Sequence, residues 1–168
     1  MGSGNLEYTM RPIAVYGGAF DPPHLGHLWV ARMAIEAIGE VIIAPSFHHR
    51  WKEPRFSFED RLAWCSAMFS MPMMTVTDME RSAGGSTWDL VQRIKVHYGR
   101  PVILVIGDDH IRLRQHWKHP DAILQLPTLI VLRNGKSSTL VRQALDRHDH
   151  QAVKELCGDR VGDMVHHH

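Results

Sequence analysis

Glycines, prolines and histidines gather in one short stretch near the start of the chain, which reads GGAFDPPHLGH over residues 17–27. His24 and His27 are three residues apart, so on a helix they share one face, with Cβ atoms roughly 5 to 6 Å apart. A helix that begins at this stretch has its positive end there, where anions bind. Gly17 and Gly18 let the backbone turn sharply and let a bulky ligand approach it. The stretch therefore predicts a phosphate-binding site.

The histidine pair has two other interpretations, a metal site and an ordinary helix surface. Structural zinc takes four ligands, and the two cysteines, Cys65 and Cys157, are too far apart in the sequence to form a pair of the usual ligand spacing. The adjacent histidines His48 and His49 are conceivable as the other two ligands. We therefore expect no metal ion held by the protein itself.

A second candidate site lies far along the chain, where residues 137–142 read SSTLVR. Ser138 and Thr139 at a helix N-terminus would offer hydroxyl and backbone N–H groups to an anion. Arg142, one turn later, can direct two hydrogen bonds to phosphate oxygens. Alone, the pattern is more typical of an ordinary helix cap, and only together with the first stretch does it favour phosphate binding.

Five short runs rich in β-branched residues predict buried strands, and the segments between them carry apolar residues spaced three and four apart. The strands are expected at 13–18, 40–45, 74–78, 101–107 and 127–133, and the helical segments at 25–39, 57–69, 86–99 and 108–125, with a further helix from Ser137 or Ser138. Alternation of this kind predicts an α/β fold with one doubly wound, five-stranded parallel sheet. In such a sheet, ligands bind beyond the carboxyl ends of the strands.

Composition narrows the class of protein. The 168 residues are expected to form a single domain over 1–165, with His166, His167 and His168 as the remnant of a purification tag. The 19 Lys and Arg nearly balance the 18 Asp and Glu, so we expect no nucleic-acid partner. The apolar runs are too short for a membrane span, and two cysteines suit a cytoplasmic protein.

The first stretch resembles the GG-x-F-D-P-x-H-x-G-H signature of the nicotinate/nicotinamide mononucleotide adenylyltransferases, a branch of the H-x-G-H nucleotidyltransferases. SSTLVR resembles the I-S-S-T-x-x-R motif of the same family. The resemblance implies a Rossmann-like fold and transfer of AMP from ATP to a pyridine mononucleotide, with release of pyrophosphate and with Mg²⁺ carried by ATP. The alternatives are an H-x-G-H nucleotidyltransferase with a different phosphorylated acceptor, and a nucleotide-binding regulator with weakened catalysis.

The resemblance also implies roles for individual residues. The catalytic residues would be His24, His27, Lys52 and Arg142; the ATP-binding residues Gly17, Gly18, Ala19, Phe20, Gly107, Asp109, Ser138 and Thr139; and the acceptor-binding residues Thr87, Trp88 and Trp117.

Two segments depart from the family pattern. GGSTWDL stands where members usually carry S-Y-T-x-D-T-L, which leaves the choice between nicotinate and nicotinamide open. Only residues 134–136 separate the fifth strand from SSTLVR, where the family inserts some tens of residues. The short connection could alter the acceptor pocket and the interface of a homo-oligomer.

Overall fold

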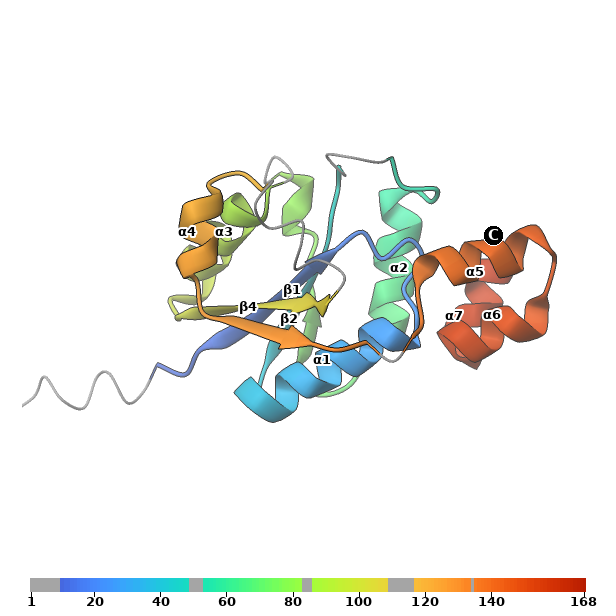
Figure 1. Ribbon diagram of the computed structural model, residues 1–168, viewed down its shortest axis with the longest axis horizontal. Coiled ribbons are helices and arrows are strands. Elements are labelled where there is room, and N and C mark those ends of the chain that lie inside the picture. Colours follow the sequence, from blue (N-terminus) through green and yellow to red (C-terminus); the bar gives the residue numbers. More distant parts are fainter. Residues whose placement is uncertain (1–9, 49–52, 83–85, 109–116, 134) are drawn as a thin grey trace, which may run out of the picture.

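A five-stranded parallel sheet forms the centre of the protein (Figure 1). The structure is a computed structural model, and it describes residues 10–48, 53–82, 86–108, 117–133 and 135–168. The strands are β1 Ile13–Gly18, β2 Val41–Pro45, β3 Met74–Val76, β4 Val102–Gly107 and β5 Thr128–Val131, in the order β3-β2-β1-β4-β5. All five predicted strands are present, and the predicted α/β parallel sheet is confirmed.

Helices cover both faces of the sheet. They are α1 Leu25–Ile38, α2 Phe58–Met68, α3 Thr87–Tyr98, α4 Pro120–Gln125, α5 Ser138–Asp146, α6 His150–Cys157 and α7 Asp159–His166, with a short 3₁₀ turn, η1, at Met79–Arg81. Alternation along β1 divides the core, because Ala14 and Tyr16 pack with α1 and α2 on one face whereas Ile13 and Val15 pack with α3 on the other. Residues buried on both faces explain why the strands read as continuous apolar runs.

The register brings the carboxyl ends of the strands to one edge. Gly18 at the end of β1 pairs with Pro45 of β2, and Gly107 at the end of β4 pairs with Val131 of β5. Strand order reverses between β1 and β4, which are neighbours in the sheet although β2 and β3 intervene in the chain. The loops after β1 and β4 therefore meet at the position where doubly wound sheets bind their ligands.

The last three helices, α5 to α7, form a group beyond this edge of the sheet (Figure 1). Ser137 is the N-cap of α5, as predicted, and its hydroxyl accepts a hydrogen bond from the backbone N–H of Leu140. The helix α7 includes His166, and Nε2 of His168 lies 2.6 Å from Oδ2 of Asp60, so these terminal histidines contact the rest of the fold. In the described part of the chain, no helix is long and apolar enough to cross a bilayer.

Candidate active site

The two histidines of the first stretch cap the helix that follows them. His24 is the N-cap of α1, and its Nδ1 accepts a hydrogen bond from the backbone N–H of Gly26 at 3.0 Å. Nδ1 of His27 accepts from the backbone N–H of His24 at 3.1 Å. The expectation that both residues lie within a helix is wrong for His24, which stands just before it. Their rings nevertheless stack, with centroids 3.7 Å apart.

His24 is uncharged in the folded protein. Its side chain has no exposed surface, and burial, together with the positive charges of Arg133 and Lys136, lowers the pKa of His24 to about 3. Because Nδ1 accepts a hydrogen bond, the single proton of the neutral ring lies on Nε2. That atom is buried and has no hydrogen-bond partner among the described residues. The site therefore contains a buried donor that an acceptor from a ligand would satisfy.

The glycine between the histidines leaves room for this arrangement. A Cβ placed on Gly26 would lie 2.8 Å from Cε1 of His24 and 3.2 Å from Cβ of Lys136. The His24 ring cannot move away without disturbing the cap that it forms, so a larger residue at position 26 is unfavourable. A Cβ on Gly17 or Gly18 would instead meet other atoms no closer than 3.5 Å, an ordinary contact distance. Contacts with the described residues thus explain Gly26 but not Gly17 and Gly18.

The loop between β1 and α1 is fixed by Phe20 and Asp21. Phe20 has a positive φ of 48°, and its buried ring packs edge-on against His27 at a centroid distance of 4.8 Å. The buried carboxylate of Asp21 accepts hydrogen bonds from the backbone N–H groups of Arg55 at 2.8 Å and Phe56 at 2.9 Å. Pro22 and Pro23, which follow Asp21, precede the N-cap His24 and so lie in the loop before α1.

A buried arginine that the sequence analysis did not select holds the other side of this loop. Arg61 of α2 is only 1% exposed, and its guanidinium donates to the backbone oxygens of Ala19 at 2.6 Å, Ser46 at 2.9 Å and Phe56 at 3.0 Å. Burial lowers the pKa of Arg61 from its ordinary value, but an arginine remains charged. One side chain thus joins the segments that follow β1 and β2 to the start of α2.

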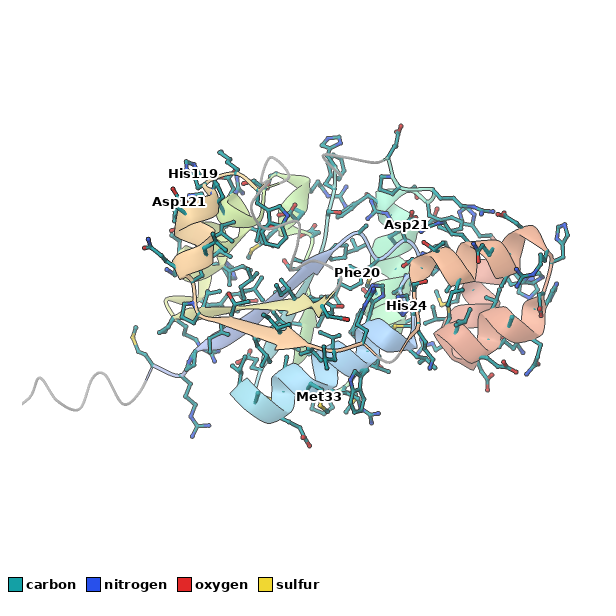
Figure 2. All side chains as sticks on the ribbon, in the orientation of Figure 1. Phe20, Asp21, His24, Met33, His119 and Asp121 are labelled. Atoms are coloured by element: carbon teal, nitrogen blue, oxygen red, sulfur yellow. The ribbon has the colours of Figure 1, made fainter. Side chains whose placement is uncertain are left out.

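The second motif docks onto the first. Arg142 donates to the backbone oxygen of Asp21 at 2.7 Å and to Oγ1 of Thr139 at 3.1 Å, and one guanidinium nitrogen lies 3.6 Å from the Asp21 carboxylate. Ser138 donates from its hydroxyl to the backbone oxygen of Pro22 at 3.0 Å. The two stretches are 116 positions apart between Ser138 and Pro22 and meet in the fold, as the site hypothesis requires. Figure 2 shows Phe20, Asp21 and His24 where the sheet approaches the C-terminal helices.

The loops after β4 and β5 complete this edge. Gly107 is the buried last residue of β4, and Oδ1 of Asp108 accepts from the backbone N–H of Arg133 at 3.1 Å. Nε of Arg133 lies 3.9 Å from the same oxygen. Two predicted site residues, Lys52 and Asp109, lie outside the described residues.

The expected acceptor-binding residues form a separate group. Thr87 is the first residue of α3, and Trp88 and Trp117 are partly buried against the core on the α3 face. The ring of Trp88 lies 5.5 Å from that of His119. Figure 2 places His119 well away from His24, so the structure does not bring this group into contact with the histidine pair.

Among the described residues, no cluster of three or more His, Cys, Asp or Glu side chains is arranged to hold a metal ion. The histidine pair is used for capping and stacking, and the acids of the site bind backbone N–H groups and arginines. The arrangement offers donors and positive charge, which suit an anionic ligand.

Comparison with known proteins identifies the family. The model of the cytidylyltransferase-like family matches residues 15–150. A Myxococcus xanthus protein named a probable nicotinate-nucleotide adenylyltransferase is 32% identical over 162 residues, which cover 82% of this chain and 85% of that protein. A Pseudothermotoga lettingae protein with the same name is 27% identical over 155 residues, which cover 88% of this chain and 75% of that protein.

A solved structure supports the fold independently. The nicotinic acid mononucleotide adenylyltransferase of Plasmodium falciparum, in complex with NaAD, has a TM-score of 0.76 to this chain at 18% identity, over 92% of this chain and 94% of that one. At that identity the likeness concerns the fold alone. From the family model and the Myxococcus relative, the chain belongs to the cytidylyltransferase-like family and, within it, to the nicotinate-nucleotide adenylyltransferases, which are nucleotidyltransferases.

Proposed function

We propose that this nucleotidyltransferase joins AMP from ATP to nicotinate or nicotinamide mononucleotide and releases pyrophosphate, a reaction of NAD biosynthesis. The observation that carries the proposal is the docking of α5 onto the loop between β1 and α1, through Arg142 and Ser138. This contact surrounds the N-terminus of α1 with donors, beside the buried Nε2–H of His24. A polyphosphate is the ligand that such a set of donors fits best.

In the proposed reaction, an oxygen of the mononucleotide 5′-phosphate attacks the α-phosphorus of ATP. The bond from that phosphorus to the bridging oxygen breaks, and pyrophosphate leaves with the bridging oxygen. No protein nucleophile takes part, so the rate depends on positioning and on neutralisation of phosphate charge. Mg²⁺ enters with ATP as part of the substrate and supplies additional positive charge to its phosphate oxygens.

His24 and His27 are the proposed stabilisers of the transferring phosphate. Each accepts a backbone hydrogen bond at Nδ1, which directs the opposite nitrogen of the ring outward from the cap. Arg142 has five N–H donors and uses two of them in the hydrogen bonds that hold the loop, so it retains donors for a phosphate oxygen. We assign the remaining charge neutralisation to Lys52, from the resemblance to the family.

Gly17 and Gly18 are proposed to let the nucleotide lie directly on the backbone. No described residue comes close enough to exclude a Cβ at either position, and close approach of a ligand is the physical reason that we propose for two glycines here. Ala19 and Phe20 continue the same surface, and Gly107, Asp109, Ser138 and Thr139 are the further residues that we propose for ATP binding.

The pyridine ring of the acceptor is proposed to bind near Thr87, Trp88 and Trp117. Two partly buried indole rings offer flat apolar faces on which an aromatic ring can stack. His119 lies well away from His24 (Figure 2), as expected if the pyridine ring and the reacting phosphate, which a ribose separates, bind at different places. The names of the relatives and the NaAD in the Plasmodium structure favour nicotinate mononucleotide as the acceptor.

The deciding experiment measures pyrophosphate release from ATP with nicotinate mononucleotide and, separately, with nicotinamide mononucleotide. We expect turnover with at least one, and we expect His27→Ala to lower kcat by roughly 10²- to 10³-fold, the effect of losing one transition-state donor. His97→Ala, at the exposed C-terminal end of α3, is the matched control and should retain full activity. ATP binding without pyrophosphate release on either acceptor would refute the proposed activity in favour of a regulator.

We further propose that the protein works in the cytoplasm, because Cys65 and Cys157 are both buried free thiols. Burial raises the pKa of Cys157 to about 12, so this thiol stays protonated and unreactive. Homo-oligomerisation remains a prediction, in which the short connection before α5 would alter the interface, and light scattering on the active preparation measures it directly.

A further inference from the structure

The connection between β5 and α5 brings two basic residues, Arg133 and Lys136, to the N-terminus of α1. This connection comprises residues 132–137. Lys136 packs against the first turn of α1, since a Cβ on Gly26 would lie 3.2 Å from Cβ of Lys136. Lys136 thus lies against the turn that follows His24 and contains His27.

Arg133 is held in place at the end of β5. Its backbone N–H donates to Oδ1 of Asp108, its Nε lies 3.9 Å from that oxygen, and its side chain is only 18% exposed. Asp108 follows β4 directly, and β4 is the neighbour of β1 at the point where strand order reverses. The carboxylate of Asp108, which is 42% exposed, therefore holds Arg133 beside the expected ligand position.

The surroundings of His24 show that both positive charges act at this point. Arg133 and then Lys136 are the charges that lower the pKa of His24, after burial itself. His24 is fully buried, and its Nε2–H has no acceptor among the described residues. An anion that binds here would accept a hydrogen bond from this buried donor and would lie beside two positive charges, and both interactions favour its binding.

We propose that Arg133 and Lys136 bind the phosphate chain of ATP beside His24, and so add two cations to the site that already contains Arg142. The inference rests on the proposed function in taking ATP as the ligand. These two residues of the short connection before α5 would then bind the substrate. They would contribute to binding of the phosphates but not to binding of the adenosine.

The test measures binding of three probes by calorimetry: ATP, inorganic pyrophosphate and adenosine. We expect Arg133→Gln to weaken ATP and pyrophosphate binding roughly 10- to 100-fold, the range for a lost charge-assisted hydrogen bond, and Lys136→Gln to weaken them less. Adenosine binding should stay within about twofold of wild type. Arg32→Gln is the matched control, because Arg32 is exposed on α1 itself.

Unchanged ATP and pyrophosphate binding in Arg133→Gln and Lys136→Gln would overturn the proposal, as would an equal loss for adenosine, which indicates a structural effect. If Arg133→Gln fails to fold, Lys136→Gln decides, with Arg133→Lys expected to retain most of the affinity for pyrophosphate. ATP binding that depends on these residues, without pyrophosphate release on either acceptor, would support this inference and refute the proposed function. Pyrophosphate release by wild type, together with unaltered ATP binding in the variants, would support the proposed function and refute this inference.

Discussion

Replacing His24 by Asn tests whether the histidine is neutral in the folded protein. Asn is a good N-cap residue, and its side-chain oxygen can accept the Gly26 N–H that Nδ1 of His24 accepts now. The variant therefore retains the cap but cannot gain a proton. A constant loss of stability is expected from the missing ring, which stacks on His27 and is fully buried. The informative quantity is how the difference in stability between variant and wild type changes with pH.

The magnitude follows from the pKa of His24, which falls from 6.5 to about 3 on folding. Below about pH 6.5 the unfolded chain binds a proton at this residue that the folded chain does not bind. The stabilising contribution is therefore present above pH 6.5 and is lost as the pH falls toward about 3. The loss is about 1.4 kcal/mol per pH unit, so it reaches about 2.7 kcal/mol at about pH 4.5. His24→Asn should lack this loss.

Urea unfolding of both proteins between about pH 7.5 and about pH 4.5 gives the two stability curves. We expect the free energy of unfolding of wild type to fall more steeply, by about 2.7 kcal/mol over the range, than that of the variant. His97→Asn controls for the removal of one histidine, since that side chain is exposed. Parallel curves for His24→Asn and wild type would show that His24 gains its proton equally well in both states, and the neutral donor would be refuted.

Two further changes test other parts of the same site and its surroundings. Glu80 is buried, and its burial, followed by the negative charge of Asp89, raises its pKa from 4.5 to about 7. The contribution of Glu80 to the stability of the fold is therefore present below about pH 4.5 and is lost as the pH rises through about 7. Glu80→Gln should therefore be more stable than wild type above about pH 8, by up to about 3 kcal/mol in thermal or urea unfolding, with no such gain at about pH 4.5. Gly26→Ala should destabilise the protein by about 1 to 3 kcal/mol and lower pyrophosphate release, because its methyl group overlaps the His24 ring. Unchanged unfolding and activity of this variant would contradict the packing argument.

The central strands β1, β2 and β4 could be predicted from the sequence because they are largely buried on both faces. A run such as IAVYGG has no polar position to leave exposed, and the alternating halves of β1 enter two separate core clusters. Helix N-caps could also be recognised in the sequence. The side chains of Ser57, Ser86 and Ser137 each accept a hydrogen bond from a backbone N–H of the helix that follows. Local residues determine both kinds of feature.

The helices α6 and α7 were not predicted, and the reason is their length. Each has eight residues, too few to be stable alone, and they form because Val153, Cys157 and Val161 are buried in the core that α1 and α2 share. The position of His24 was missed for a related reason. Histidine is not a preferred N-cap residue, and only the second histidine three positions later completes the reciprocal cap.

Within the site, the sequence identified the two motifs but not the groups that hold them together. Asp21 lies inside the first stretch, and its acidic type in an otherwise apolar turn was a usable signal for a buried partner. Arg61 gave no such signal, since one arginine in an amphipathic helix normally faces solvent. Its three backbone acceptors come from segments that meet only in the folded chain.

These anchors explain how the site can be formed before any nucleotide binds. Arg61 fixes the backbone of Ala19, while Asp21 fixes the segment that begins at Arg55 and accepts Arg142 from α5. Every one of these bonds lies within the protein, so the turn that carries His24 does not need a ligand to order it. Binding then costs little conformational entropy, and more of the interaction with phosphate remains to stabilise the transition state. Arg61 and Asp21 accordingly serve only as anchors, whereas Arg142 and Ser138 both hold the loop and belong to the proposed phosphate-binding residues.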